Sequence, residues 1–215
     1  MVRTLLRADH KKASTFSWSF FYALLLSPSI KQIHFHYLSS MRRVILIGFM
    51  GSGKTSLGKK LATRMNIPFF DSDVEIERAQ LKSIGEIFGT YGESRFREME
   101  TGFIDAMHEE DEFVLSTGGG MPCFNKNMEE LNKLGTTFYL ERSPKELAHR
   151  LRNAKTQRPL ISGLSDEDLV TYIEDKLSER EEYYKHASFV LAREDQKITE
   201  IERLINLLEH PDQKS

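Results

Sequence analysis

Residues 48–55 read Gly-Phe-Met-Gly-Ser-Gly-Lys-Thr and match the pattern G-x-x-x-x-G-K-[ST]. The pattern directly follows a short apolar run, Val44–Ile47, and opens a stretch with helical spacing, Lys54–Met65. A phosphate-binding loop requires this strand–loop–helix context. Its glycines let the backbone curl so that successive N–H groups form an anion nest, and the helix dipole adds positive potential. A chance glycine-rich turn would need neither flank, so the pattern predicts an α/β domain that binds a nucleoside triphosphate.

The residues of this loop have separate predicted tasks. Lys54 should reach the β- and γ-phosphates. Thr55 should offer its hydroxyl to Mg²⁺, a hard cation that prefers oxygen ligands and is commonly shared with substrate phosphates. The predicted ATP-binding residues here are Gly48, Gly51, Ser52, Gly53, Lys54, Thr55 and Ser56.

The composition narrows the class of protein. The chain has 215 residues, 40% hydrophobic and 29% charged, which is typical of one soluble globular domain with appendages. Its single cysteine, Cys123, excludes an internal disulfide and a thiolate metal cage. The net charge of −2 gives no general attraction to nucleic acid. Zinc fingers, iron–sulfur proteins and multi-span membrane proteins are therefore excluded.

Residues 1–40 differ from the remainder of the chain. They carry five Lys/Arg and one acid, a charge of +4, so the other residues sum to −6. The apolar stretch Phe16–Leu26 has the length of a signal-peptide core and is too short to span a bilayer. A targeting peptide and a membrane-surface anchor are two interpretations. We favour a third, a start codon assigned upstream of Met41, which stands three residues before the first predicted strand. We expect residues 41–215 to form one cytoplasmic domain, or an organellar one if the extension is a transit peptide.

Five short β-rich apolar runs alternate with segments long enough for helices. They are Val44–Ile47, Ile67–Phe70, Phe113–Ser116, Thr136–Leu140 and Ser188–Ala192. This alternation predicts a parallel sheet between two layers of helices. Capping signals at Ser83-x-x-Glu86 and Ser165-x-x-Asp168 predict two helix starts, and Ile198–Leu208 predicts a final amphipathic helix.

Polar residues and glycines follow the second and third predicted strands. Asp71-Ser72-Asp73 comes after the second, and ligands of open parallel sheets bind at the carboxyl ends of strands. One carboxylate could orient a Mg²⁺-bound water while the other accepts a hydrogen bond from a substrate hydroxyl. Capping of the next helix, Val74–Ala79, by Ser72 or Asp73 is an equal alternative. Gly118-Gly119-Gly120 follows the third strand and would leave backbone N–H groups bare for a ligand, unless it is merely a loose loop.

Six motifs in chain order together resemble the shikimate kinase family, P-loop kinases with a nucleoside monophosphate kinase-like fold. They are Gly51-Ser52-Gly53-Lys54-Thr55, Asp71-Ser72-Asp73, Phe96-Arg97-x-x-Glu100, Gly118-Gly119-Gly120, Arg158-Pro159-Leu160 and Arg180-x-x-Tyr183. The resemblance covers about residues 42–210, and only the first motif is common to P-loop proteins generally.

The resemblance implies a five-stranded parallel sheet in the order 2-3-1-4-5 and a mobile lid. It also implies transfer of the ATP γ-phosphoryl group, with Mg²⁺, to the 3-hydroxyl of shikimate, giving shikimate 3-phosphate and ADP on the route to chorismate and the aromatic amino acids. In this family the residues matching Arg97 and Arg180 hold the shikimate carboxylate, and those matching Gly118, Gly119 and Gly120 line the same pocket.

The same resemblance assigns the reacting groups. Asp73 would contact the substrate hydroxyls, Asp71 would join Thr55 at the magnesium, and Arg158 would close over the transferring phosphoryl group and the ATP. The catalytic residues would then be Lys54, Asp73 and Arg158. We place the lid at about residues 153–168, where it would exclude water from ATP.

Several points stay open at this level. Either Arg150 or Arg152 would stack on adenine, and Arg193 is a further candidate. We expect a monomer whose partners are ATP and shikimate, with no nucleic acid and, for the core domain, no membrane. The rival functions are phosphorylation of another metabolite, such as gluconate or a nucleotide, and a nucleotide-dependent switch without a small-molecule acceptor.

Overall fold

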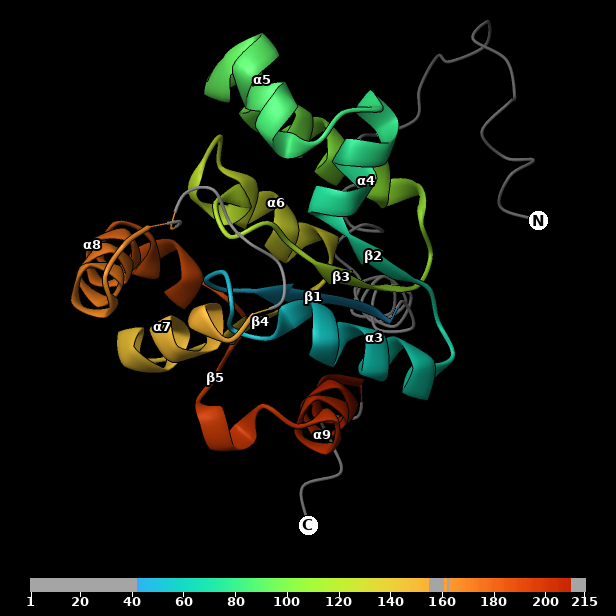
Figure 1. The fold of residues 1–215 in the computed structure, drawn as a ribbon. Helices are drawn as coiled ribbons and strands as arrows, with labels where there is room; N and C mark the ends of the chain where they lie inside the picture. The colour runs from blue at the N-terminus through green and yellow to red at the C-terminus, as the bar shows by residue number, and fades with distance from the viewer. Residues whose placement is uncertain (1–41, 155–160, 162, 210–215) are drawn as a thin grey trace, which may run out of the picture. The chain divides into compact units, whose positions relative to one another are not determined.

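A computed structural model describes residues 42–154, 161 and 163–209 of the chain (Figure 1). Its sheet has five parallel strands in the order β2-β3-β1-β4-β5. The strands are β1 (Arg43–Ile47), β2 (Phe69–Asp71), β3 (Phe113–Ser116), β4 (Thr136–Leu140) and β5 (Phe189–Leu191). The strand order that the resemblance implied is confirmed.

Helices connect the strands and follow the last of them. They are α3 (Lys54–Met65), α4 (Ser72–Gln80), α5 (Ile84–Ala106), α6 (Asn127–Leu134), α7 (Pro144–Arg152), α8 (Asp166–Lys185) and α9 (Ile198–Glu209). Single 3₁₀ turns lie at η2 (Met107–Glu109), η3 (Met121–Cys123) and η5 (Arg193–Asp195). Within these described parts of the chain, no helix is long and apolar enough to cross a membrane.

Alternating residues of the central strand face two separate apolar cores. Ile45 and Ile47 belong to the core that includes Ile104 of α5 and Ile173 of α8. Val44 and Leu46 belong to the other core, with side chains of α3 and α9. Figure 1 shows α3 and α9 together on one side of the sheet and α5, α6 and α8 on the other. The predicted three-layer arrangement is confirmed.

The second strand starts later than the sequence pattern predicts. Asn66 ends α3 in the left-handed conformation, with φ 56°, and Ile67 then donates its N–H to the carbonyl of Ala62 at 3.1 Å. Because this N–H forms a hydrogen bond that ends the helix, it is not available to the sheet, and Ile67 does not begin the strand. The strand instead runs Phe69–Asp71, which makes Asp71 its last residue.

The predicted helix starts at Ser83 and Ser165 are confirmed. Ser83 Oγ accepts the Glu86 N–H, and the Glu86 carboxylate accepts the Ser83 N–H at 2.8 Å, a complete capping box. Ser165 Oγ accepts the N–H of Asp168 at 3.1 Å. Such caps satisfy donors that a helix N-terminus leaves unpaired. The helix that starts after Ser83 kinks at Gly92, whose φ of 78° is not helical.

Candidate active site

The loop between β1 and α3 has the curled backbone of an anion nest. Positive φ angles occur at Gly48 (138°), Gly51 (83°) and Gly53 (108°). Residues with a side chain rarely adopt these angles, so the path of the loop depends on glycine. Lys54 opens α3 and is only 8% exposed. Its Nζ donates to the carbonyl oxygens of Gly48 at 2.8 Å and Phe49 at 3.0 Å, which holds the ammonium inside the loop.

Three oxygen-bearing side chains meet beside this loop. Thr55 Oγ1 donates to Asp71 Oδ2 at 2.9 Å and lies 3.4 Å from Ser116 Oγ. These residues come from α3, β2 and β3, so the sheet edge brings together the two predicted metal ligands. Ser116 was not predicted. Its signal in the sequence is a hydroxyl at the end of an otherwise apolar strand, immediately before Thr117 and the glycine triplet.

The helix-cap alternative for Ser72 and Asp73 is wrong. The N-cap position of α4 belongs to Asp71, whose side chain makes no capping bond, and Ser72 is already the first helical residue. Ser72 Oγ instead accepts the N–H of Gly118 at 2.8 Å. The expectation that the triplet leaves N–H groups bare for a ligand therefore does not hold for Gly118, whose N–H is used within the protein.

The outer glycines of the triplet make room for side chains of the site. A Cβ at Gly118 would lie 2.4 Å from Asp73 Oδ1, and one at Gly120 would lie 2.7 Å from Arg97 Nη1. At Gly119 the nearest atom would be 3.5 Å away, an ordinary contact. Asp73 and Arg97 thus reach the glycine loop from α4 and α5, and a loose loop does not explain this close fit.

Arg97 is held firmly by its surroundings. Its guanidinium donates to Glu100 Oε2 at 2.7 Å and to Glu93 Oε1 at 2.8 Å, and it lies 4.1 Å from the centre of the Phe124 ring. Glu100 is 1% exposed. Burial raises the pKa of Glu100 to about 7, and the Arg97 charge opposes this rise. The buried pair fixes the Arg97 head beside Gly120.

Arg180 approaches the same loop from α8. A Cβ at Gly119 would lie 3.6 Å from Arg180 Nη1, and the guanidinium is 5.6 Å from the centre of the Phe49 ring. The tyrosine of the sequence motif, Tyr183, is 42% exposed, whereas its neighbour Tyr184 is fully buried. The Tyr184 hydroxyl donates to the Gly119 carbonyl. The loop therefore gathers groups from three helices.

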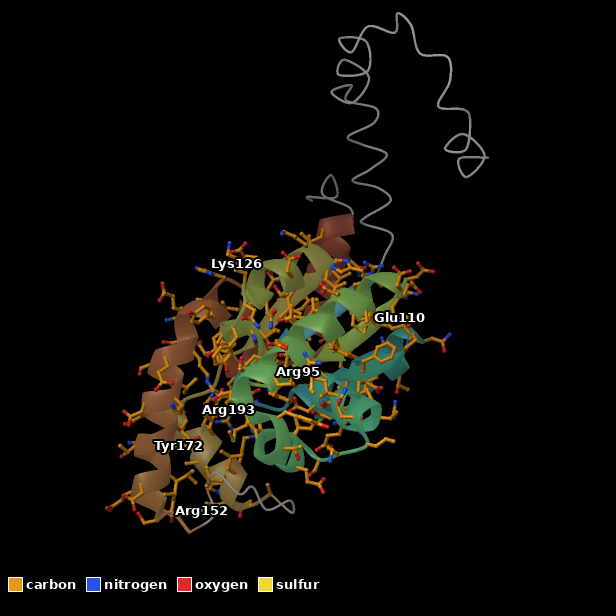
Figure 2. All side chains as sticks on the ribbon, turned by 90° about the horizontal axis from the view of Figure 1, so that it is seen from above. Arg95, Glu110, Lys126, Arg152, Tyr172 and Arg193 are labelled. Atoms are coloured by element: carbon orange, nitrogen blue, oxygen red, sulfur yellow. The ribbon has the colours of Figure 1, made fainter. Side chains whose placement is uncertain are left out.

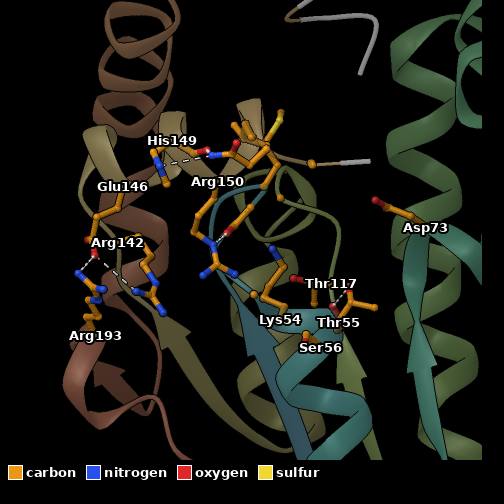
Figure 3. A pocket seen from close by; sticks show the side chains of 18 of the residues that line it. Lys54, Thr55, Ser56, Asp73, Thr117, Arg142, Glu146, His149, Arg150 and Arg193 are labelled. Carbon is orange, nitrogen blue, oxygen red and sulfur yellow. Dashed lines mark hydrogen bonds and ion pairs between the residues drawn. The ribbon is translucent and has the colours of Figure 1, made fainter. Parts of the chain in front are cut away.

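A cavity of about 880 Å³ extends from this region along the phosphate loop. Figure 3 shows Arg193, Arg142 and Glu146 at one side, Lys54 and Thr55 in the middle, and Asp73 at the opposite side. Glu146 accepts from Arg193 at 2.8 Å and pairs with Arg142 at 3.5 Å. Burial, followed by the neighbouring arginine charges, lowers the pKa of Arg142.

The two arginines that the sequence left as alternatives for the adenine contact, Arg150 and Arg152, have different surroundings in the structure. Arg150 lines the cavity and donates its Nε–H to the Gly51 carbonyl at 2.7 Å. Arg152 pairs with Asp166 at 2.6 Å, is absent from the cavity wall, and lies at the edge of the described domain in Figure 2. Arg193 also lines the cavity.

Other cavity residues were missed by sequence reasoning. They are Arg142, Lys145, Glu146 and His149. The available signal was a second capping box, Ser143-x-x-Glu146, directly after the fourth strand. It starts α7, and residues of that helix line the cavity together with the phosphate loop.

Arg158 lies outside the described residues, as do Pro159 and Leu160. Its assignment as a lid residue therefore stays a prediction, and so does the lid at about residues 153–168, of which only the two ends are described. The status of residues 1–40, which are also outside the described residues, remains a prediction too.

Comparisons with known proteins agree with this geometry. A family model described as shikimate kinase matches residues 50–209. A shikimate kinase of Bacteroides fragilis is 41% identical over 175 residues, covering 78% of this chain and 98% of that protein. A crystal structure of the Bacteroides thetaiotaomicron shikimate kinase has a TM-score of 0.72 at 40% identity, covering 78% of this chain and 98% of that one.

A second solved structure is the Acinetobacter baumannii shikimate kinase in complex with shikimate. It has a TM-score of 0.69 at 28% identity, covering 84% of this chain and 99% of that one. The family model and these relatives span nearly all of the described domain. The chain belongs to the shikimate kinase family.

Proposed function

We propose that the shikimate kinase activity of this chain is divided between two halves of one site. ATP would lie along the phosphate loop and α7, and shikimate would lie against the glycine triplet. The observation that carries this proposal is the convergence of Asp73, Arg97 and Arg180 on the triplet, at the Asp73 end of the cavity. Shikimate has one carboxylate and three hydroxyls, which match two arginines and an aspartate.

The nucleotide half follows the order of groups in the cavity. The phosphates would occupy the nest at residues 48–55, where Lys54 can exchange its bonds to loop carbonyls for bonds to phosphate oxygens. The base would then lie toward Arg150 and Arg193 at the opposite side from Asp73. This direction points the γ-phosphate at the acceptor half.

The oxygen donors beside the loop fit a magnesium ion. Mg²⁺ keeps several waters and is usually bound through one or two protein oxygens together with substrate phosphates. Thr55 and Asp71 present such oxygens 2.9 Å apart, and Ser116 Oγ lies 3.4 Å from the Thr55 hydroxyl. We propose that Thr55 and Asp71 hold the Mg²⁺ that accompanies ATP, where it would neutralise charge on the phosphates.

In the acceptor half, Arg97 and Arg180 would bind the carboxylate, which does not react. Asp73 would accept a hydrogen bond from the 3-hydroxyl and take its proton as the hydroxyl oxygen attacks the γ-phosphorus. The bond from that phosphorus to the bridging oxygen breaks, and ADP leaves. Positioning and charge stabilisation by Lys54 and the loop N–H groups would carry most of the catalysis, with no covalent enzyme intermediate.

We further propose that the enzyme acts as a monomer in the cytoplasm, without nucleic acid or membrane. All residues assigned to the two halves of the site come from one chain, so the proposed chemistry requires no second copy. A reducing compartment matches the single cysteine.

Arg97→Ala tests the acceptor half directly. Removing one member of a desolvated charge pair should lower kcat/KM for shikimate by the equivalent of about 2–5 kcal/mol in activation free energy, while the KM for ATP stays close to the parent value. Arg95→Ala is the matched control, because Arg95 lies on the same helix, is 58% exposed at its side chain and pairs with Glu98 on the surface. Steady-state kinetics with each substrate varied would check this. An effect on ATP rather than shikimate would assign Arg97 to the nucleotide half.

The glycine triplet allows a second paired test. Gly118→Ala should displace the Asp73 carboxylate and lower kcat about 100-fold, the usual consequence of misplacing a reacting group by about 1 Å. Gly119→Ala meets only ordinary contacts and should keep kcat within about twofold. Equal losses in the two variants would contradict the proposed reason for the glycines.

A further inference from the structure

Tyr184 is a fully buried side chain that the proposed chemistry does not use. It lies on α8, one helical turn after Arg180, and its ring packs against Tyr139 of β4 with 5.0 Å between ring centres. A buried phenol needs partners for its hydroxyl, because an unpaired polar group away from water destabilises the fold. The partners of this hydroxyl therefore indicate its task.

Both partners belong to the acceptor half of the site. The hydroxyl donates its hydrogen to the Gly119 carbonyl. The Arg180 guanidinium is the other partner: its positive charge acts on the same hydroxyl and lowers the pKa of Tyr184, against the larger rise that burial causes. Burial raises the pKa of Tyr184, so the hydroxyl keeps its proton and remains a donor. Tyr184 and Arg180 thus meet at the middle glycine of the triplet, where the Tyr184 hydroxyl bonds the carbonyl and Arg180 Nη1 would lie 3.6 Å from a Cβ.

We propose that Tyr184 is a positioning residue for the acceptor carboxylate. Its hydroxyl fixes the Gly119 carbonyl and holds the Arg180 guanidinium where it meets the substrate. Arg180 otherwise faces the Phe49 ring, which can attract the charge but cannot fix the direction of its N–H groups. This inference rests on the proposed function, because it assigns Arg180 to the carboxylate.

Tyr184→Phe tests the inference, since it removes the hydroxyl and leaves the ring packed against Tyr139. Tyr183→Phe is the matched control, because Tyr183 is the adjacent residue and is 42% exposed. We expect Tyr184→Phe to raise the KM for shikimate about 5- to 30-fold, which corresponds to a loss of about 1–2 kcal/mol of interactions of the hydroxyl. The kcat and the KM for ATP should change less than about twofold, and the control should match the parent.

A double-mutant cycle shows whether the hydroxyl acts through Arg180. If it does, Tyr184→Phe combined with Arg180→Ala should bind shikimate no more weakly than Arg180→Ala alone. Additive losses would overturn the inference, as would an unchanged KM for shikimate or an equal rise in both KM values. Loss of the cooperative thermal transition in Tyr184→Phe would overturn it as well, because the hydroxyl would then serve the core. A parent enzyme that fails to phosphorylate shikimate would instead overturn the proposed function, and this inference with it.

Discussion

Lys54→Met should lower kcat by about 10²–10³-fold, because the variant loses a preorganised positive charge at the transferring phosphoryl group. Methionine has a comparable length, so the first turn of α3 can still form. The Lys54 ammonium also bonds the Gly48 and Phe49 carbonyls, and leaving these acceptors without their donor should lower the free energy of unfolding by about 1–3 kcal/mol. Both effects arise from one side chain but are measured separately.

Kinetics and thermal melting of Lys54→Met are best compared with those of Lys60→Met. Lys60 lies on the same helix and is exposed. The Lys60→Met variant should keep the parental kcat and the parental free energy of unfolding. A Lys54→Met enzyme that retained more than about a tenth of the parental rate would contradict the role of the loop lysine, since such charge contacts contribute at least 100-fold.

Asp73→Asn should lower kcat by about 10²–10⁴-fold while leaving the KM for ATP near its parental value. The amide has the shape of the carboxylate and keeps the close fit against Gly118, but it cannot accept the hydroxyl proton. The effect should therefore appear in the chemical step. Single-turnover measurements with saturating ATP and shikimate would isolate that step.

The matched control for Asp73→Asn is Glu75→Gln, on the same turn of α4. Glu75 pairs with Arg78 on the helix surface, and its loss should leave kcat unchanged. If Asp73→Asn kept full kcat, Asp73 would only orient the acceptor, and the proton would have to leave by another route.

The loop and the sheet were predictable because their signals are local. The start and end of α3 match the sequence pattern to the residue, since both Gly53 and Asn66 use the left-handed region. The strand order came from the resemblance, because apolar runs alone do not say which strands are neighbours. The start of α6 carried no signal: Lys126 precedes it with φ 60° and no capping bond.

The finer choices within the site depended on helix rotation. Tyr183 and Tyr184 are neighbours on α8, yet successive helical residues point about 100° apart, so one is exposed and the other buried. Arg150 and Arg152 point to nearly opposite sides of α7 for the same reason. A motif written as residue spacing does not fix that rotation, which packing decides.

The triplet shows a different limit of sequence reasoning. Three glycines at a strand end predicted open backbone for a ligand. The structure uses Gly118 and Gly120 to admit Asp73 and Arg97, and it pairs the Gly118 N–H with Ser72. Ser72 lies 46 positions before Gly118 in the chain, and Asp73 and Arg97 are also distant in sequence from the triplet. The spacing within the motif therefore did not reveal these contacts.

The most direct test of the account is ADP release by the full chain with MgATP and a panel of acceptors. Shikimate, quinate, gluconate and nucleoside monophosphates should be compared at equal concentration, and the product identified by phosphorus NMR. We predict that shikimate alone accelerates ADP release and that its product carries the phosphate on the 3-hydroxyl. Faster ADP release with another acceptor but not with shikimate, or ADP release that no acceptor changes, would contradict the assignment of shikimate as the acceptor.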